Sequence, residues 1–144
     1  MRLRETGSSG SSILRSTDDK LEKRLLFITR NVQSGAGGMQ LYARILLAAL
    51  GQQPEIDLTV IGYGGGRLGL PFFLAFAWIR VVFTTSHFVH FGDAASAIVL
   101  PILRLLRPDL RFSVTTYGLD LVYPLAPYQW LLRHSLPHAH CVVC

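Results

Sequence analysis

Cysteine is scarce in this chain of 144 residues, and the two cysteines present, Cys141 and Cys144, lie together at its end. A redox CxxC pair needs its attacking thiol at a helix N-terminus, and a zinc site needs two further ligands. The intervening Val142 and Val143 are instead typical of a buried strand. We therefore predict neither a redox centre nor a zinc site, and nothing indicates an oxidising compartment.

Long apolar runs are also missing. The longest, residues 68–83, is interrupted by Pro71 and Arg80 and is shorter than the ~20 residues of a membrane-spanning helix. It predicts a helix that is buried or lies on a surface. A helix in a membrane interface needs a charged face opposite its apolar face, and residues 70–79 carry no charge. Burial in the domain is the favoured interpretation, and a membrane-surface interaction module is the alternative.

Charged residues make up only 16% of the chain, and its net charge of +5 comes from scattered basic residues. A nucleic-acid interface would show basic side chains in a stripe with aromatic ones between them, so no nucleic-acid partner is predicted. Excess positive charge suits a phosphate-bearing ligand or an anionic membrane surface equally well. Residues 1–24 are rich in serine, glycine and charge, without the apolar core of a signal peptide. We interpret them as a flexible leader or a cloning remnant.

The remaining residues, 25–144, alternate between strand-like and helical patterns. Short apolar runs predict strands at residues 25–29, 56–61, 87–91, 112–116 and 140–144. Apolar residues at helical spacing between them predict buried faces made of Tyr42, Ile45, Leu46, Ala49 and Leu50, of Ala95, Ile98, Val99, Ile102, Leu103 and Leu106, and of Tyr128, Leu131, Leu132, Ser135 and Leu136. We predict one α/β domain, a Rossmann-like parallel sheet with helices on both faces, strand order 3-2-1-4-5 and residues 25–29 central.

In such a sheet, ligands bind beyond the carboxyl ends of the strands. Three polar or glycine-rich segments follow predicted strands there: residues 33–40, 90–93 and 117–120. The first contains Ser34-Gly-Ala-Gly-Gly38 directly before a predicted helix. Glycines let the backbone approach a ligand, and the free N–H groups of a first helical turn bind anions. The alternative is a tight turn that binds nothing.

A second glycine cluster contains Gly64, Gly66 and Gly69 at the spacing of a dinucleotide fingerprint, with Asp93 downstream. This gives an NAD(P)-binding Rossmann domain as an alternative function. Pro71 in the first turn of the following helix counts against it, because the fingerprint needs a free helix N-terminus. So does its place after the second strand, since the fingerprint follows the first. The simpler interpretation is a flexible loop.

Several of these segments together resemble the N-terminal domain of the family 4 glycosyltransferases of the GT-B fold, over residues 25–144. The resemblance lies in Phe27-Ile-Thr-Arg30 before Gly37-Gly38-Met39, in Val89-His-Phe-Gly-Asp93, in Val114-Thr-Thr-Tyr-Gly-Leu-Asp120, and in Tyr128-Gln-Trp-Leu-Leu-Arg133 before the last strand. It implies a retaining enzyme that moves a sugar from a nucleotide-diphosphate sugar to an acceptor hydroxyl. In that family the first domain supplies the acceptor side and a glycine loop near the donor diphosphate. The second domain holds the nucleotide, and no cofactor or metal is implied.

The resemblance also implies site residues. Gly37 and Gly38 would stabilise the growing charge of the diphosphate, and Gln40 would contact the ligand or stand as an exposed helix residue. His90 and Asp93 would line the acceptor side. The alternatives are a hydrogen-bonded histidine at a strand end and an aspartate that caps the helix after it.

The segment Tyr117-Gly118-Leu119-Asp120 matches the family's His-Gly-x-Asp motif except at its first residue. The resemblance implies that Tyr117 and Asp120 are catalytic residues and that Gly118 lines the acceptor side. A phenol donates a hydrogen bond to a sugar hydroxyl, but it does not carry a proton near neutral pH as imidazole does. For Asp120 the alternative is a loop carboxylate that caps the next helix.

His134 and His138 lie near a helix end, with His140 beyond. No carboxylate or thiolate of suitable geometry is near them and Pro137 interrupts the helix between them, so no metal site is predicted. The resemblance further implies that the chain stops inside the first domain. We interpret it as a fragment that lacks the nucleotide-binding domain and is inactive alone. Its expected partners are a nucleotide-diphosphate sugar, an acceptor that in such enzymes is often lipid-linked, and the missing C-terminal domain. The expected location is the cytoplasm, with contact to the membrane periphery as an option.

Overall fold

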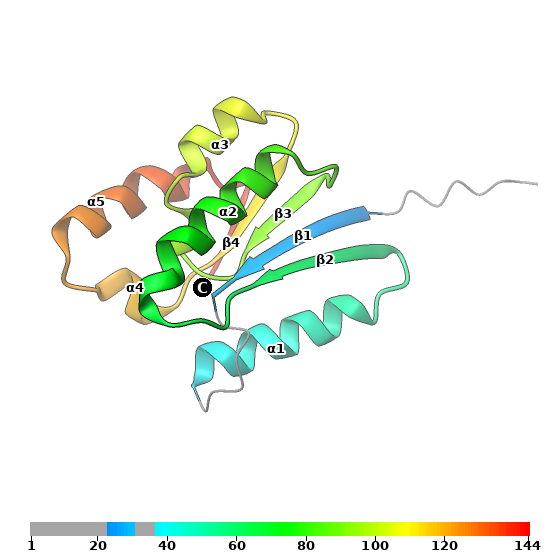
Figure 1. Cartoon of the computed structure of the whole chain (residues 1–144), viewed down its shortest axis with the longest axis horizontal. Helices are drawn as coiled ribbons and strands as arrows, with labels where there is room; N and C mark the ends of the chain where they lie inside the picture. The colour runs from blue at the N-terminus through cyan, green and yellow to red at the C-terminus, as the bar shows by residue number, and fades with distance from the viewer. Residues whose placement is uncertain (1–22, 31–36) are drawn as a thin grey trace, which may run out of the picture.

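The computed structural model describes residues 23–30 and 37–144 and has the predicted α/β architecture (Figure 1). Most of the predicted leader and residues 31–36 of the first glycine loop, Ser34 included, lie outside the described residues. Lys23 and Arg24, predicted to belong to the leader, are the first residues of a strand. The domain therefore begins two residues earlier than predicted.

The helices and strands alternate along the chain. In order they are β1 (Lys23–Thr29), α1 (Gly38–Gly51), β2 (Ile56–Gly62), the 3-10 turn η1 (Arg67–Gly69), α2 (Leu70–Val82), β3 (Phe88–Phe91), the 3-10 turn η2 (Ala95–Ala97), α3 (Leu100–Leu106), β4 (Arg111–Thr115), α4 (Gly118–Val122), α5 (Ala126–Ser135), the 3-10 turn η3 (Leu136–His138) and β5 (Cys141–Val143). Prolines in the first turns of α2, α3 and α5 are compatible with helix starts, where no N–H partner is needed. Pro101 also marks the division of the helix predicted around residues 95–106 into η2 and α3.

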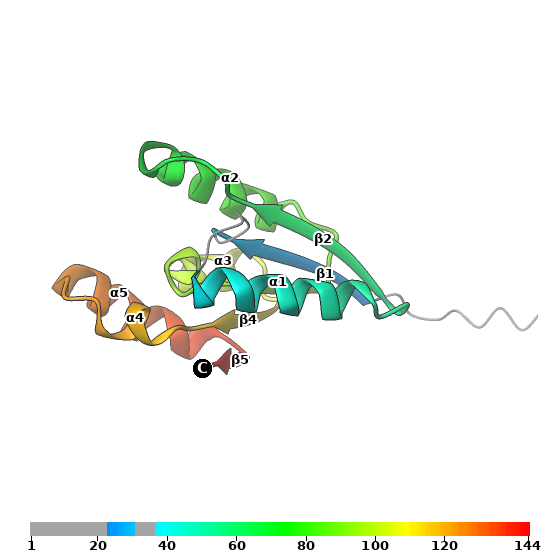
Figure 2. The same cartoon turned by 90° about the horizontal axis from the view of Figure 1, so that it is seen from below.

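All five described strands are parallel, and their order is β2-β1-β3-β4-β5, which Figure 2 shows from β2 at one edge to β5 at the other. The predicted order 3-2-1-4-5 is therefore wrong. The strand predicted to be central, β1, is an inner strand, but the middle of the five described strands is β3. In the predicted order β2 would be covered on both edges and both faces. Its Asp57 and Thr59 are exposed, which suits an edge strand and not an inner one.

The two faces of the sheet are covered unequally. Helices α2, α3 and α5 lie on one side of the sheet and α1 lies on the other (Figure 1). The main core is on the first side, where alternate residues of β1, β3 and β4 meet α2 and α3. Its strand residues are Leu26, Ile28, Val89, Phe91, Phe112 and Val114, and its helix residues include Phe73, Ala77, Val81, Leu100 and Leu103.

The predicted buried faces of two helices are only partly correct. In α1, Tyr42 and Ile45 are exposed, and Ala43 is the one fully buried residue, because the helix packs mainly beside the edge strand β2. In the η2–α3 region, Ala97, Leu100 and Leu103 are buried while Ile102 is exposed. The helix is interrupted between Ala97 and Leu100, just before Pro101, which shifts the helical phase. A single helical periodicity applied to residues 95–106 therefore predicts the wrong buried residues.

Two further predictions of burial fail. The last strand is formed as expected, but Cys141 and Cys144 are exposed, because β5 is an edge strand of the described sheet. The helix within residues 68–83 is buried on one side only. Within the described ranges no helix combines the length and apolarity needed to cross a bilayer.

Candidate functional site

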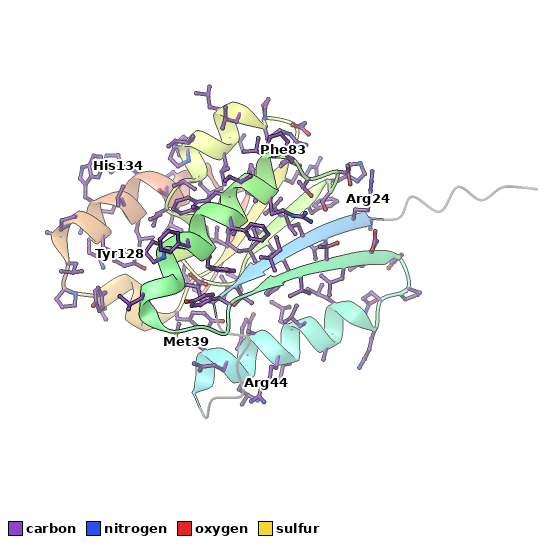
Figure 3. All side chains as sticks on the ribbon, in the orientation of Figure 1. Arg24, Met39, Arg44, Phe83, Tyr128 and His134 are labelled. Carbon is purple, nitrogen blue, oxygen red and sulfur yellow. The ribbon has the colours of Figure 1, made fainter. Side chains whose placement is uncertain are left out.

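The carboxyl ends of β1, β3 and β4 bring the three predicted segments together at one edge of the sheet. Arg30 follows β1, Asp93 follows β3, and Tyr117 and Asp120 follow β4. The Tyr117 hydroxyl donates to the Met39 carbonyl at 3.4 Å, which places the start of α1 beside the end of β4. Met39 and Tyr128 lie toward this end of the molecule in Figure 3. The described part of the glycine loop and the other two segments therefore share one site.

An ion pair ties the ends of β1 and β3. Arg30 donates from Nε to Asp93 Oδ1 at 2.8 Å and from its backbone N–H to Asp93 Oδ2 at 3.1 Å. The Asp93 side chain is fully buried, whereas that of Arg30 keeps 23% of its surface exposed. Arg30 was not predicted as a site residue. The available signal was its position, a cation directly after the central strand and before the glycine loop.

Asp93 also caps the turn that follows it. Its Oδ1 accepts the Ser96 N–H at 2.9 Å, and its carbonyl accepts the Ser96 hydroxyl at the same distance. The capping alternative is therefore supported, and this carboxylate has few lone pairs left for a ligand. Asp93 serves the site chiefly by holding Arg30.

Asp120 and Tyr117 are adjacent to this pair. The Asp120 carboxyl is buried within α4 and accepts the Ala94 N–H at 3.4 Å, so it reaches the start of the turn that follows β3. Burial raises the pKa of Asp120, and the nearby Asp93 carboxylate adds to the effect. Burial, together with Asp93, also raises the pKa of Tyr117 to about 12. Tyr117 therefore acts as a hydrogen-bond donor and not as a phenolate.

Tyr128 is a neighbour that the sequence did not single out as a site residue. It is half-buried on α5, and burial raises its pKa to about 12, with the Asp120 and Asp93 carboxylates adding and Arg30 opposing. Its helical spacing predicts instead that it belongs to the buried face of a helix. The long reach of a tyrosine from α5 toward the ends of β3 and β4 is a tertiary feature that periodicity does not contain.

Gly37 and Gly38 open α1 and both are exposed. Among the described residues no side chain caps this helix end. Gln40 folds back over Gly37, where an added Cβ would collide with its amide, so the Gln40 side chain is half-buried against the loop. An added Cβ at Gly38 would meet nothing within 4 Å, and the same holds for Gly118 at the start of α4. Neither glycine is required by packing within the described structure.

A pocket of about 310 Å³ lies beside this helix start. Ligand-binding cavities in proteins begin at about this size. The pocket is open to solvent next to the Tyr117 ring, which meets the Tyr42 ring edge-on at 6.1 Å. Its lining residues are Gly38, Tyr42, Thr115, Thr116, Tyr117, Val143 and Cys144.

His90 is a residue of β3, and both nitrogens of its ring have hydrogen-bond partners. Its Nδ1 is 2.8 Å from the Ser113 hydroxyl and its Nε2 is 3.1 Å from the Thr115 hydroxyl, while its ring stacks on Phe27. Burial lowers the pKa of His90 to about 4, so the ring is neutral near pH 7. These contacts support the alternative of a hydrogen-bonded structural histidine over an acceptor-side role.

The second glycine cluster folds around Tyr63. The Tyr63 hydroxyl donates to the Gly66 carbonyl, and a Cβ at Gly65 would lie 2.7 Å from that hydroxyl. The Tyr63 ring packs against Phe73 with 4.9 Å between ring centroids. Gly65 and Gly69 therefore make room for a tyrosine, and the cluster follows the edge strand β2 and not an inner strand of the sheet.

The histidines near the chain end are engaged separately. His134 Nδ1 donates to the Trp130 carbonyl at 2.7 Å, and His140 Nδ1 accepts the Phe112 N–H at 3.0 Å. In the described part of the chain, no three His, Cys, Asp or Glu residues are grouped as a metal site. No protein-family model and no curated protein sequence matches the chain.

Proposed function

We propose that this chain is the acceptor-side domain of a glycosyltransferase and that its ligand is a nucleotide-diphosphate sugar. The observation that carries the proposal is the position of the site at a topological switch point. From β1 the chain passes to β2 on one side, and β3 then returns to the other side of β1. Connections that leave in opposite directions open a crevice at the carboxyl ends, and ligands of doubly wound sheets bind there.

The groups at this crevice suit a diphosphate. The start of α1, which no side chain of the described residues caps, presents N–H groups and the positive end of the helix dipole. Arg30 adds a fixed positive charge, because Asp93 holds its Nε, and among the described residues its other guanidinium nitrogens form no hydrogen bond. We propose that both stabilise the negative charge that develops on the diphosphate as the sugar leaves.

The remaining groups suit a sugar. We propose that the Tyr117 hydroxyl exchanges its long hydrogen bond to the Met39 carbonyl for one donated to a sugar hydroxyl, and that the Asp120 carboxyl accepts a hydrogen bond from the sugar. The raised pKa of Asp120 favours a role in which it shares a proton with the substrate. The nucleotide would be bound by a second domain, so residues 23–144 on their own are proposed to bind the donor weakly. The proposed setting is cytoplasmic.

The alternative NAD(P) function would use the cluster from Gly64 to Gly69. Its glycines pack around Tyr63 beside an edge strand, so this alternative has weaker support than the crevice between β1 and β3.

A titration of the chain's amide signals by NMR tests the proposal. UDP-glucose and GDP-mannose should each shift the signals of Gly38, Met39 and Arg30, with a dissociation constant in the millimolar range. Inorganic phosphate at equal ionic strength is the control for nonspecific anion binding. Shifts confined to residues 64–69, and caused by NAD⁺ alone, would overturn the proposal in favour of the dinucleotide alternative.

A further inference from the structure

The outer side of α2 is an apolar stripe. Its large side chains are spaced three or four residues apart, which places them on one face of the helix. Phe72 and Phe83 each expose 79% of their surface. The stripe consists of Phe72, Phe76 and Ile79 on α2, together with Leu68 in η1 before the helix and Phe83 at its C-cap.

The opposite side of α2 explains why this helix carries no charged face. Phe73, Ala77 and Val81 are buried there against the sheet. A free interfacial helix needs a polar face toward water, but α2 turns its second face into the protein core. The lack of a charged face on residues 70–79 therefore does not count against binding at a membrane surface in the folded protein.

Charge around the stripe is positive. Residues 68–109 contain three arginines, Arg80, Arg104 and Arg107, and two acidic residues. Asp93 is buried and paired with Arg30, and the exposed Asp109 is paired with Arg107. Helix α3, which packs beside α2, exposes Ile102, Leu105 and Leu106 and contains Arg104. No carboxylate on α2 or α3 would repel an anionic surface.

A cationic pocket adjoins the C-terminal end of the stripe. It has a volume of about 200 Å³, and its lining includes Arg24, Arg80, Phe83, Thr84, Ser86 and Asp57. The Thr84 and Ser86 hydroxyls are 3.1 Å apart, and neither Arg24 nor Arg80 forms an ion pair with any residue of the described ranges. Two guanidinium groups against one carboxylate leave the pocket positive. Figure 3 shows Arg24 and Phe83 at the end of the molecule opposite Met39.

The walls of this pocket are held in place. Arg107 donates from Nη1 to the Val82 carbonyl at 2.7 Å and to the Thr84 carbonyl at 3.0 Å. The Ser86 N–H donates to the Thr84 hydroxyl at 3.2 Å. Guanidinium and hydroxyl groups in a fixed array are the usual partners of a phosphate group.

We propose that α2 docks on an anionic phospholipid bilayer, with the stripe inserted among the acyl chains and a lipid phosphate in the pocket of Arg24 and Arg80. An apolar stripe alone would also fit a partner protein. The cationic pocket next to Phe83 and the absence of carboxylates from α2 and α3 favour a membrane. The proposal does not rest on the proposed transferase function, because the site and the stripe are on different parts of the molecule.

Vesicle sedimentation with the full chain tests this. The chain should sediment with vesicles of phosphatidylglycerol and phosphatidylcholine, and much less with phosphatidylcholine alone. Phe72→Asp with Phe76→Asp should abolish sedimentation, and Arg80→Gln should weaken it about fivefold. Ile45→Asp is the matched control, because Ile45 exposes 58% of its surface on the opposite side of the sheet against 54% for Phe76.

Three outcomes would overturn the proposal. One is a wild-type chain that does not sediment with anionic vesicles. A second is an Ile45→Asp variant that loses binding as completely as the α2 variant. A third is a dimer in solution that the α2 variant dissociates without any vesicle binding, which would identify a second copy as the occupant. Circular dichroism establishes whether each variant is folded. If the variant with both Phe72→Asp and Phe76→Asp does not fold, Arg80→Gln still tests the proposal. Free phosphate should not compete at millimolar concentration if the lipid headgroup is the ligand.

Discussion

The Arg30 guanidinium donates to the buried Asp93 carboxylate at 2.8 Å across 63 positions of sequence. This contact joins the end of β1 to the end of β3, the two strands between which the connections diverge. One interaction therefore fixes both sides of the proposed ligand crevice.

Breaking this pair should destabilise the fold. Arg30→Met leaves a buried carboxylate without its cation, which costs about 3 kcal/mol or somewhat less, because Arg30 is partly exposed. Chemical denaturation measures the loss. Asp109→Asn, which removes the exposed partner of Arg107, should change stability little. Equal losses of stability from the two substitutions would show that the buried pair stabilises the fold no more than the exposed pair does.

Gly92 is predicted to be required for packing. A Cβ at this position would lie 2.8 Å from Thr29 Cβ and 3.0 Å from Phe27 Cε1, where β3 passes close to β1. Gly92→Ala should therefore cost ~1–3 kcal/mol of stability. Gly118→Ala, with nothing within 4 Å of the new methyl group, is the control and should leave the melting temperature almost unchanged. A stable Gly92→Ala protein would mean that β3 moves freely away from β1.

His90 should make stability depend on pH. Its pKa is about 4 in the folded chain and 6.5 in the unfolded chain, so between these values the unfolded state binds more protons. Stability is then fully present above pH 6.5 and falls as the pH drops toward 4, by roughly 3 kcal/mol in all. Denaturation of His90→Asn across this range should show a flatter pH dependence than wild type. His134→Gln, at an exposed position, should keep the wild-type slope.

Element type could be predicted from the sequence, whereas strand order could not. The strands, and the helices from Gly38 to Gly51 and from Ala126 to Ser135, follow from local apolar spacing. Which edge of β1 receives β3 depends on contacts between distant residues. The exposed Asp57 and Thr59 were the one local sign that β2 lies at an edge.

The site could be predicted only in part, because some of its residues meet through contacts between distant parts of the sequence. Strand ends locate Asp93, Tyr117 and Asp120 at one edge, because parallel strands share a direction. Arg30 and Tyr128 join them only through tertiary contacts, and His90 leaves the site because Ser113 and Thr115 occupy both its nitrogens. The packed stripe expected of Tyr42 and Ile45 is exposed, so the stability of α1 does not depend on it.

Gly38→Val tests the central claim most directly, in the enzyme that the proposed function implies, with a nucleotide-binding domain joined to this one. A Cβ at this position meets nothing within 4 Å in the described structure, and it stands at the helix start proposed to face the diphosphate. Sugar transfer should fall about a hundredfold, a loss of ~3 kcal/mol of transition-state stabilisation, with an unchanged melting temperature. Transfer at the wild-type rate, measured on a protein of wild-type stability, would contradict the account and leave the loop as a simple turn.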